Sequence, residues 1–206
     1  MYKFFEPYIG KTYKKHGVMI LGEAHICGEC SCEYCQTNKD KQCVNGHVDL
    51  VNKQIKTGSI KTYCRLEKEF LGAPIGDEGK RQEFYNQFLF TNLLGVAMQK
   101  SGEAPSDSFF SEACRQRFLD IILKYQPGYL IVLGNRTFEH LPGNLNDMWT
   151  VEKEILNGDH FEIWTLLYKG VSVRVLNIYH PSWIGMSNEK IEIVRKRICY
   201  LLKKSN

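Results

Sequence analysis

Two short polar motifs carry side chains that could do chemistry, and each follows an apolar run typical of a buried strand. Residues 22–25 read Gly-Glu-Ala-His and follow the apolar run 18–21, while residues 180–182 read His-Pro-Ser and follow the strand-like run 171–179. Open α/β sheets bind their ligands at the carboxyl ends of the strands. This pair of motifs, at opposite ends of one domain-length chain, therefore predicts an active site at one edge of a sheet.

Three residues at these predicted strand ends are candidates for chemistry. A carboxylate is costly in a core, so Glu23 is expected in a cleft with water or a ligand rather than in a packing role. A neutral His180 could donate to a developing oxyanion, or it could simply be satisfied by a backbone carbonyl. Asn92 follows another apolar run, and its amide could read the edge of an amide-like ring, although asparagine at a strand end is also a common turn former. His25 could orient a substrate or hydrogen-bond its own loop.

The rest of the chain alternates between strand and helix patterns. Strands of the main sheet are expected at 17–22, in a run that ends at Asn92, and at 129–134. Two further strands, at 161–168 and 171–178, flank a turn at Lys169-Gly170, and one of these two strands is expected to join the main sheet. Amphipathic helices are expected at 112–125, capped by Ser108 or Ser111, and at 188–204. This order predicts the α/β class: a three-layer α/β/α domain covering 1–206, with a central, mostly parallel sheet of four to five strands.

Composition and charge narrow the class of protein. The 206 residues are 43% hydrophobic and 24% charged, with no apolar stretch near membrane-spanning length and no signal-peptide pattern at the start. We therefore expect a cytoplasmic protein that has no membrane partner. The net charge of +4 would suit contact with nucleic acid. The C-terminal basic run is either a solvated helix face or a phosphate-facing surface; it comprises Arg195, Lys196, Arg197, Lys203 and Lys204.

Five of the eight cysteines fall within seventeen residues, in the segment 27–43. In a reducing compartment such a group predicts metal ligation, zinc being the natural candidate, and His47 adds a possible nitrogen donor. The segment 27–82 is polar and is expected to form a Cys-rich insertion, with some helix at 44–56. The alternative to a metal site is that the cysteines are free thiols on this insertion. The candidate ligands are Cys27, Cys30, Cys32, Cys35 and Cys43.

Taken together, four stretches resemble the uracil-DNA glycosylase superfamily, in its iron–sulfur branch. Residues 18–24 resemble the branch's strand that ends in Gly-Glu-Ala-Pro, and 90–94 resemble its strand that ends in Thr-Asn. Residues 127–134 are similar to its third strand and the proline before it, and 179–183 look like its Tyr-His-Pro-Ser-Tyr motif. Pro105 and Cys114 also stand at similar spacings. The resemblance covers 17–25 and about 88–184 and implies a uracil-DNA glycosylase-like fold.

The resemblance implies a DNA glycosylase that hydrolyses the N-glycosidic bond of uracil or a related damaged base, with DNA as partner and base-excision repair as context. Glu23 would position or activate the attacking water, and His180 would stabilise negative charge on the departing ring. Asn92 would bind the base edge, next to Ala24 and His25. Ser182 would touch the DNA backbone, and Trp183 could fill the vacated stack.

The chain also departs from that branch. His25 stands where the branch has proline, and only Cys114 matches a cysteine of its iron–sulfur cluster, so the 27–43 group would hold a different metal or none. Phe70 and Phe84 are the candidates for an aromatic that stacks on the base. Two other functions stay open: a non-catalytic relative that binds nucleic acid or a nucleotide, and a metal-stabilised interaction module built on 27–64.

Overall fold

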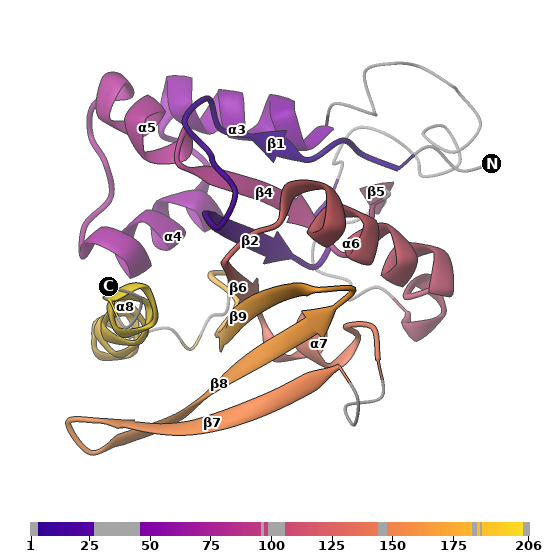
Figure 1. The fold of residues 1–206 in the computed structure, drawn as a ribbon. Helices are drawn as coiled ribbons and strands as arrows, with labels where there is room; N and C mark the ends of the chain where they lie inside the picture. Colours follow the sequence, from indigo (N-terminus) through magenta and orange to yellow (C-terminus); the bar gives the residue numbers. More distant parts are fainter. Residues whose placement is uncertain are drawn as a thin grey trace.

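The computed structural model describes residues 4–26, 46–95, 97–98, 106–143, 148–182, 185 and 187–203. Its secondary structure contains both strands and helices, with three helices in succession between β3 and β4 and three strands in succession before α8 (Figure 1). The strands are β1 (Tyr8–Ile9), β2 (Val18–Gly22), β3 (His25–Ile26), β4 (Phe88–Asn92), β5 (Ala97–Met98), β6 (Tyr129–Leu133), β7 (Trp149–Leu156), β8 (Asp159–Tyr168) and β9 (Val171–Ile178). The helices are α3 (Gly46–Thr57), α4 (Lys61–Leu71), α5 (Glu78–Tyr85), the 3₁₀ turn η1 (Asp107–Phe109), α6 (Glu112–Tyr125), α7 (Asn135–Glu139) and α8 (Asn188–Lys203).

The main sheet of the described chain has seven strands in the order β1-β4-β2-β6-β9-β8-β7. Its centre, β4-β2-β6-β9, is parallel, while β1 pairs antiparallel with β4 and β8 pairs antiparallel with both β9 and β7. The predicted α/β class is confirmed. The predicted strand number of four to five is wrong, because the sheet is a mixed one of seven strands.

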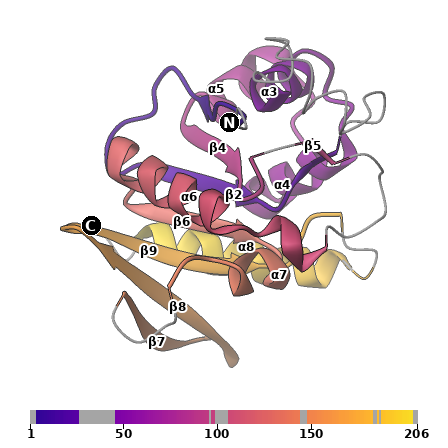
Figure 2. The same cartoon turned by 90° about the vertical axis from the view of Figure 1, so that its right-hand side faces the viewer.

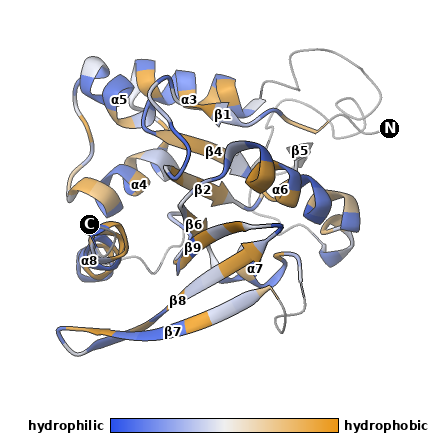
Figure 3. Ribbon diagram, viewed as in Figure 1, coloured by the Kyte–Doolittle hydropathy of each residue, from blue (hydrophilic) through white to orange (hydrophobic). Residues whose placement is uncertain are grey.

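The extra strands are β1, which pairs with β4, and strands of a C-terminal meander formed by β7, β8 and β9. Both of its turns pair a non-glycine residue at positive φ with a glycine at positive φ, at Asn157-Gly158 and at Lys169-Gly170. Such turns match the twist of a two-stranded hairpin. As a result both strands of the predicted hairpin join the sheet, not one of them, and β7 adds a further edge strand. The sequence of β7 mixes apolar residues with a charged stretch at 152–154, without a continuous apolar run (Figure 3).

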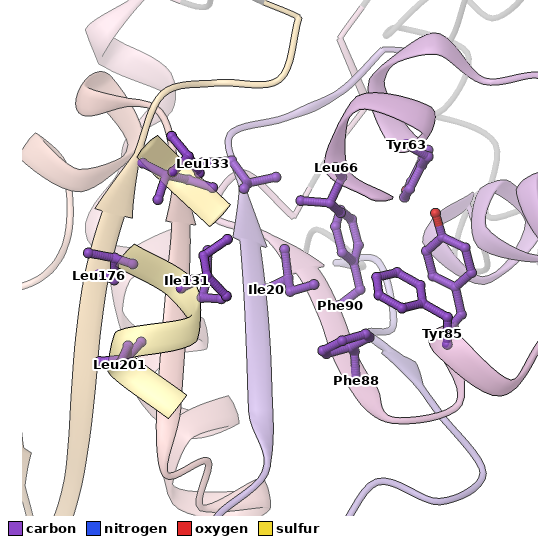
Figure 4. Close-up of a cluster of buried hydrophobic side chains, with 14 of the residues drawn as sticks. Ile20, Tyr63, Leu66, Tyr85, Phe88, Phe90, Ile131, Leu133, Leu176 and Leu201 are labelled. Atoms are coloured by element: carbon purple, nitrogen blue, oxygen red, sulfur yellow. The ribbon is translucent and has the colours of Figure 1, made fainter. Parts of the chain in front are cut away.

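Helices cover both faces of the sheet because its central strands alternate their apolar side chains between two cores (Figures 1 and 2). Ile20 faces the core shared with α3, α4, α5 and α8, where Leu66 and Leu201 pack (Figure 4). Met19 and Leu21 face the opposite core, which α6 covers. Alternation of this kind explains why the central strands read as continuously apolar runs.

The described part of the predicted insertion, 46–82, contributes to this core. Helices α3 and α4 place Val51 and Leu66 against the sheet, both almost fully buried. Helix α6 starts where predicted, with Ser111 Oγ accepting a hydrogen bond from the Cys114 amide, so the cap is Ser111 rather than Ser108. Among the described helices, none is long and apolar enough to cross a membrane.

Candidate functional site

The carboxyl ends of the four parallel strands lie level with one another, in the order β4, β2, β6, β9. Gly22 pairs with Asn92 across β2 and β4, and Leu133 pairs with Ile178 across β6 and β9. Neighbouring strands are roughly 5 Å apart. The edge therefore presents Asn92, then Glu23, then the loop after β6, and then His180. The structure thus brings the three predicted chemical residues to one edge, with β6 between the strands that carry Glu23 and His180.

Asn92 is buried at the end of β4 and packs directly against Gly22. A Cβ atom at Gly22 would collide with Oδ1 of Asn92, so glycine is required for this close approach. The Asn92 carbonyl accepts a hydrogen bond from Arg117 Nη1 at 3.0 Å. Arg117 also donates to the Phe5 carbonyl at 2.6 Å and to Thr91 Oγ1 at 3.0 Å. Arg117 therefore holds the end of β4 in place, and burial lowers its pKa to about 10, so it stays charged near neutral pH.

Glu23 is half-buried beside the guanidinium of Arg136. Their Oε1 and Nη1 atoms are 3.4 Å apart, and only 22% of the Glu23 side chain is exposed. Burial raises the pKa of this carboxyl, while the charges of Arg136 and His140 oppose the rise. Burial is the larger effect, so Glu23 binds a proton more readily than an ordinary glutamate.

Sequence reasoning missed the group that surrounds Glu23. Arg136 Nη2 and His140 Nε2 lie 3.3 Å and 3.4 Å from Asp107 Oδ1. The His140 ring stacks on Phe110 with ring centres 3.8 Å apart, and the Arg136 guanidinium carbon lies 5.2 Å from the centre of the same ring. One signal could have identified Arg136: it comes two residues after Gly134, directly beyond a buried strand, as Glu23 and His180 do.

His180 is held by the loop that follows it. The backbone N–H of Ser182 donates to Nδ1 at 3.2 Å, and Ser182 Oγ lies 2.6 Å from the same nitrogen. A backbone N–H can only donate, so Nδ1 accepts and the proton of the neutral ring is on Nε2. Burial lowers the pKa of His180, which favours the neutral ring. The residue is thus prepared to donate one hydrogen bond from Nε2.

Gly134 allows the loops after β6 and β9 to meet. It has a φ of +98°, and a Cβ added there would lie 3.2 Å from Cβ of His180. Its amide also donates to the Ile178 carbonyl at 2.8 Å. The glycine at the end of the predicted strand 129–134 therefore has two roles, a left-handed backbone and a close contact with the histidine.

Other predicted residues lie elsewhere or outside the described part of the chain. Ala24 is half-buried and packs on the α6 side of the sheet, and the backbone of His25 pairs with Ala97 in a separate small sheet. Phe70 and Phe84 both contact Phe88, the first residue of β4. The two rings are thus at the opposite end of β4 from Asn92, and the structure does not bring them to the edge that carries Glu23 and His180. Trp183 lies outside the described residues.

The predicted metal ligands fall in the segment that the structure does not describe. Cys27, Cys30, Cys32, Cys35 and Cys43 all lie there. The described residues contain no cluster of three potential metal ligands. Cys114 is a buried core residue whose sulfur lies 3.6 Å from the Phe109 carbonyl. The ring of His47 packs 5.1 Å from the ring of Phe5.

Two arginines of the C-terminal basic run are engaged within the protein. Arg195 bonds to Glu192 through two nitrogens, at 2.7 and 2.6 Å, and Arg197 bonds to Asp159 through two nitrogens, both at 2.6 Å. These contacts favour the interpretation of this run as a helix face over a surface that binds phosphates.

A pocket of about 550 Å³ is lined by residues of α6, α7, β7 and β8 and of the segment between α7 and β7. Its lining includes the aromatic residues Phe138, Trp149 and Trp164 and the carboxylates Glu112 and Glu139. Its lining does not include Glu23, Asn92 or His180.

At the strand edge the chain combines a half-buried carboxyl, a buried amide and a neutral imidazole donor. A carboxylate can orient or deprotonate water, and a fixed N–H donor can stabilise an anion that forms in the reaction. No protein-family model matches this chain, and no curated protein is significantly similar to it.

Proposed function

We propose that this protein is a DNA glycosylase that hydrolyses the N-glycosidic bond of uracil or a related damaged base. The observation that carries the proposal is the state of His180: a neutral ring with its proton on Nε2, at the same sheet edge as Glu23 and Asn92. The motif resemblance supports the same residues in the same roles. An anionic leaving group is what such a donor stabilises best.

In this mechanism the target nucleotide leaves the base stack, and its base binds at the strand edge beside Glu23, Asn92 and His180. The C1′–N bond breaks and its electron pair remains on the base, where the Nε2–H of His180 hydrogen-bonds the developing negative charge. Water attacks the resulting oxocarbenium-like sugar, and Glu23 orients this water and accepts its proton. Arg136 keeps the Glu23 carboxyl in place, 3.4 Å away. Asn92 pairs with the amide-like edge of the base and so distinguishes uracil from cytosine.

The test is base release from an oligonucleotide that carries one uracil, single-stranded and duplex, with the full chain. We expect the wild type to release uracil, and Glu23→Gln to lose roughly 10²-fold or more, because the base for water is removed. His180→Ala should lose roughly 10²-fold or more, the usual cost of removing an oxyanion donor. His160→Ala is the matched control, since this exposed histidine lies on β8.

Each outcome distinguishes between functions. Release that falls in both site variants, but not in the control, supports the glycosylase. An unchanged rate in His180→Ala would contradict its role as donor to the leaving base. Absence of any release by the wild type, on uracil and on a panel of damaged bases, would favour a relative that binds nucleic acid or a nucleotide without cutting it.

A further inference from the structure

Helix α4 contacts the loop that holds His180, although the two are far apart in sequence. Arg65 Nη1 donates to the carbonyl of Pro181 at 2.9 Å, across 116 residues. Pro181 is buried and has no N–H of its own, so its carbonyl is the polar group that it contributes to this loop. The carbonyl belongs to the peptide group that joins Pro181 to Ser182. The N–H of that same peptide group is the one that donates to His180 Nδ1.

The two hydrogen bonds therefore use opposite ends of one planar group. A peptide unit is rigid, so fixing its carbonyl also fixes the direction of its N–H. A charged donor on the oxygen also polarises the amide, which makes the N–H a stronger donor to the next acceptor in the chain. The order of contacts is the Arg65 guanidinium, the Pro181–Ser182 peptide, and His180 Nδ1.

Arg65 projects from a firmly anchored part of the fold. The neighbouring residues Tyr63 and Leu66 are buried against the sheet. Glu67 accepts hydrogen bonds from Gln54 and Tyr85, each at 2.9 Å, and from the Ile75 amide, also at 2.9 Å. The backbone of α4 is thus fixed at this point, so the core rather than the loop sets where the Arg65 side chain starts.

We propose that Arg65 is a positioning residue, which holds the Pro181–Ser182 peptide so that His180 Nδ1 remains a hydrogen-bond acceptor and Nε2 remains the donor. The consequence for catalysis rests on the proposed function, but the structural effect on His180 does not. Neither of the two motifs at the strand ends contains this residue, and it lies outside the segments that carry the resemblance.

NMR of the full-length, ¹⁵N-labelled protein tests the structural effect. Arg65→Met should make the Ser182 amide exchange with solvent about tenfold faster or more, since a charge-assisted hydrogen bond that orders its peptide is lost. The ¹⁵N chemical shift of His180 Nδ1 should also change, away from the value of a ring nitrogen that accepts a hydrogen bond. Arg65→Lys keeps a cation and should restore part of the protection. Arg195→Met is the matched control, because it removes a positive charge from α8, near the end of α4, without touching the loop.

Unchanged Ser182 exchange and an unchanged Nδ1 resonance in a folded Arg65→Met protein would overturn the proposal. Equal changes in Arg195→Met would overturn it as well, since the effect would then come from the loss of any nearby positive charge and not from the hydrogen bond of Arg65. In base release, Arg65→Met should lower kcat about tenfold and leave KM nearly unchanged, with partial rescue in Arg65→Lys. If the wild type releases no base, the proposed function fails, while the NMR measurements still decide the role of Arg65.

Discussion

Replacing Glu69 by glutamine should stabilise this protein, and increasingly so as the pH rises. Glu69 lies on α4, is fully buried, and neither of its carboxyl oxygens has a hydrogen-bond partner among the described residues. Burial raises the pKa of this carboxyl to about 8, although the charge of Arg65 opposes the rise. At neutral pH the folded protein therefore holds a proton that the unfolded chain releases.

The size of the effect follows from the pKa shift. A rise from 4.5 to about 8, at about 1.4 kcal/mol for each pH unit, corresponds to ~5 kcal/mol. The sign is destabilising: between these two values the folded state binds more protons than the unfolded state, so the free energy of unfolding falls as the pH rises. Below pH 4.5 the cost is absent, and above pH 8 it is fully present. Glutamine has no charge and removes this dependence.

The prediction is tested by measuring the free energy of unfolding in urea for the wild type and Glu69→Gln at pH 5, 6, 7, 8 and 9. The advantage of the variant should be small at pH 5 and should reach several kcal/mol at pH 8 and 9. Glu67→Gln is the matched control two residues away. It should be destabilised at every pH, because the two Glu67 oxygens accept three hydrogen bonds and glutamine replaces one of these oxygens with an NH₂ donor. A difference between Glu69→Gln and wild type that stays constant with pH would refute the reasoning.

Three further predictions concern the strand edge and the cysteines. Asn92→Asp should change the preference for uracil over cytosine in competition assays more than it lowers the melting temperature; a variant that merely unfolds would indicate a structural asparagine. Because burial raises the pKa of Glu23, base release should fall on acidification with a midpoint above 4.5 in a pH–rate profile, and Glu23→Gln should lack this limb. Elemental analysis should find about one zinc or iron per chain, lost in Cys30→Ser and Cys35→Ser but kept in Cys199→Ser; no stoichiometric metal in the wild type would contradict the ligand prediction.

The local elements of this fold could be predicted because their signals are local. The apolar run before Glu23 and the run 129–134 predict β2 and β6, and the spacing of apolar residues in 112–125 predicts α6. Strand β7 could not be predicted, since an edge strand needs no apolar face and its pairing is decided by β8. The antiparallel strands β1, β8 and β7 turned an expected mostly parallel sheet into a mixed one.

The sequence by itself determined that Asn92 ends a buried strand and that Glu23 and His180 follow buried strands, because strand-forming runs and the polar residues at their ends are contiguous in the chain. Parallel pairing then had to place them at one edge. Only the tertiary structure decided what touches them: Arg136 beside Glu23, and Arg65 on the peptide that holds His180. The physical reason is that a hydrogen bond or ion pair depends on distances of about 3 Å. Residues separated by a hundred positions reach such distances only after the helices have packed on the sheet.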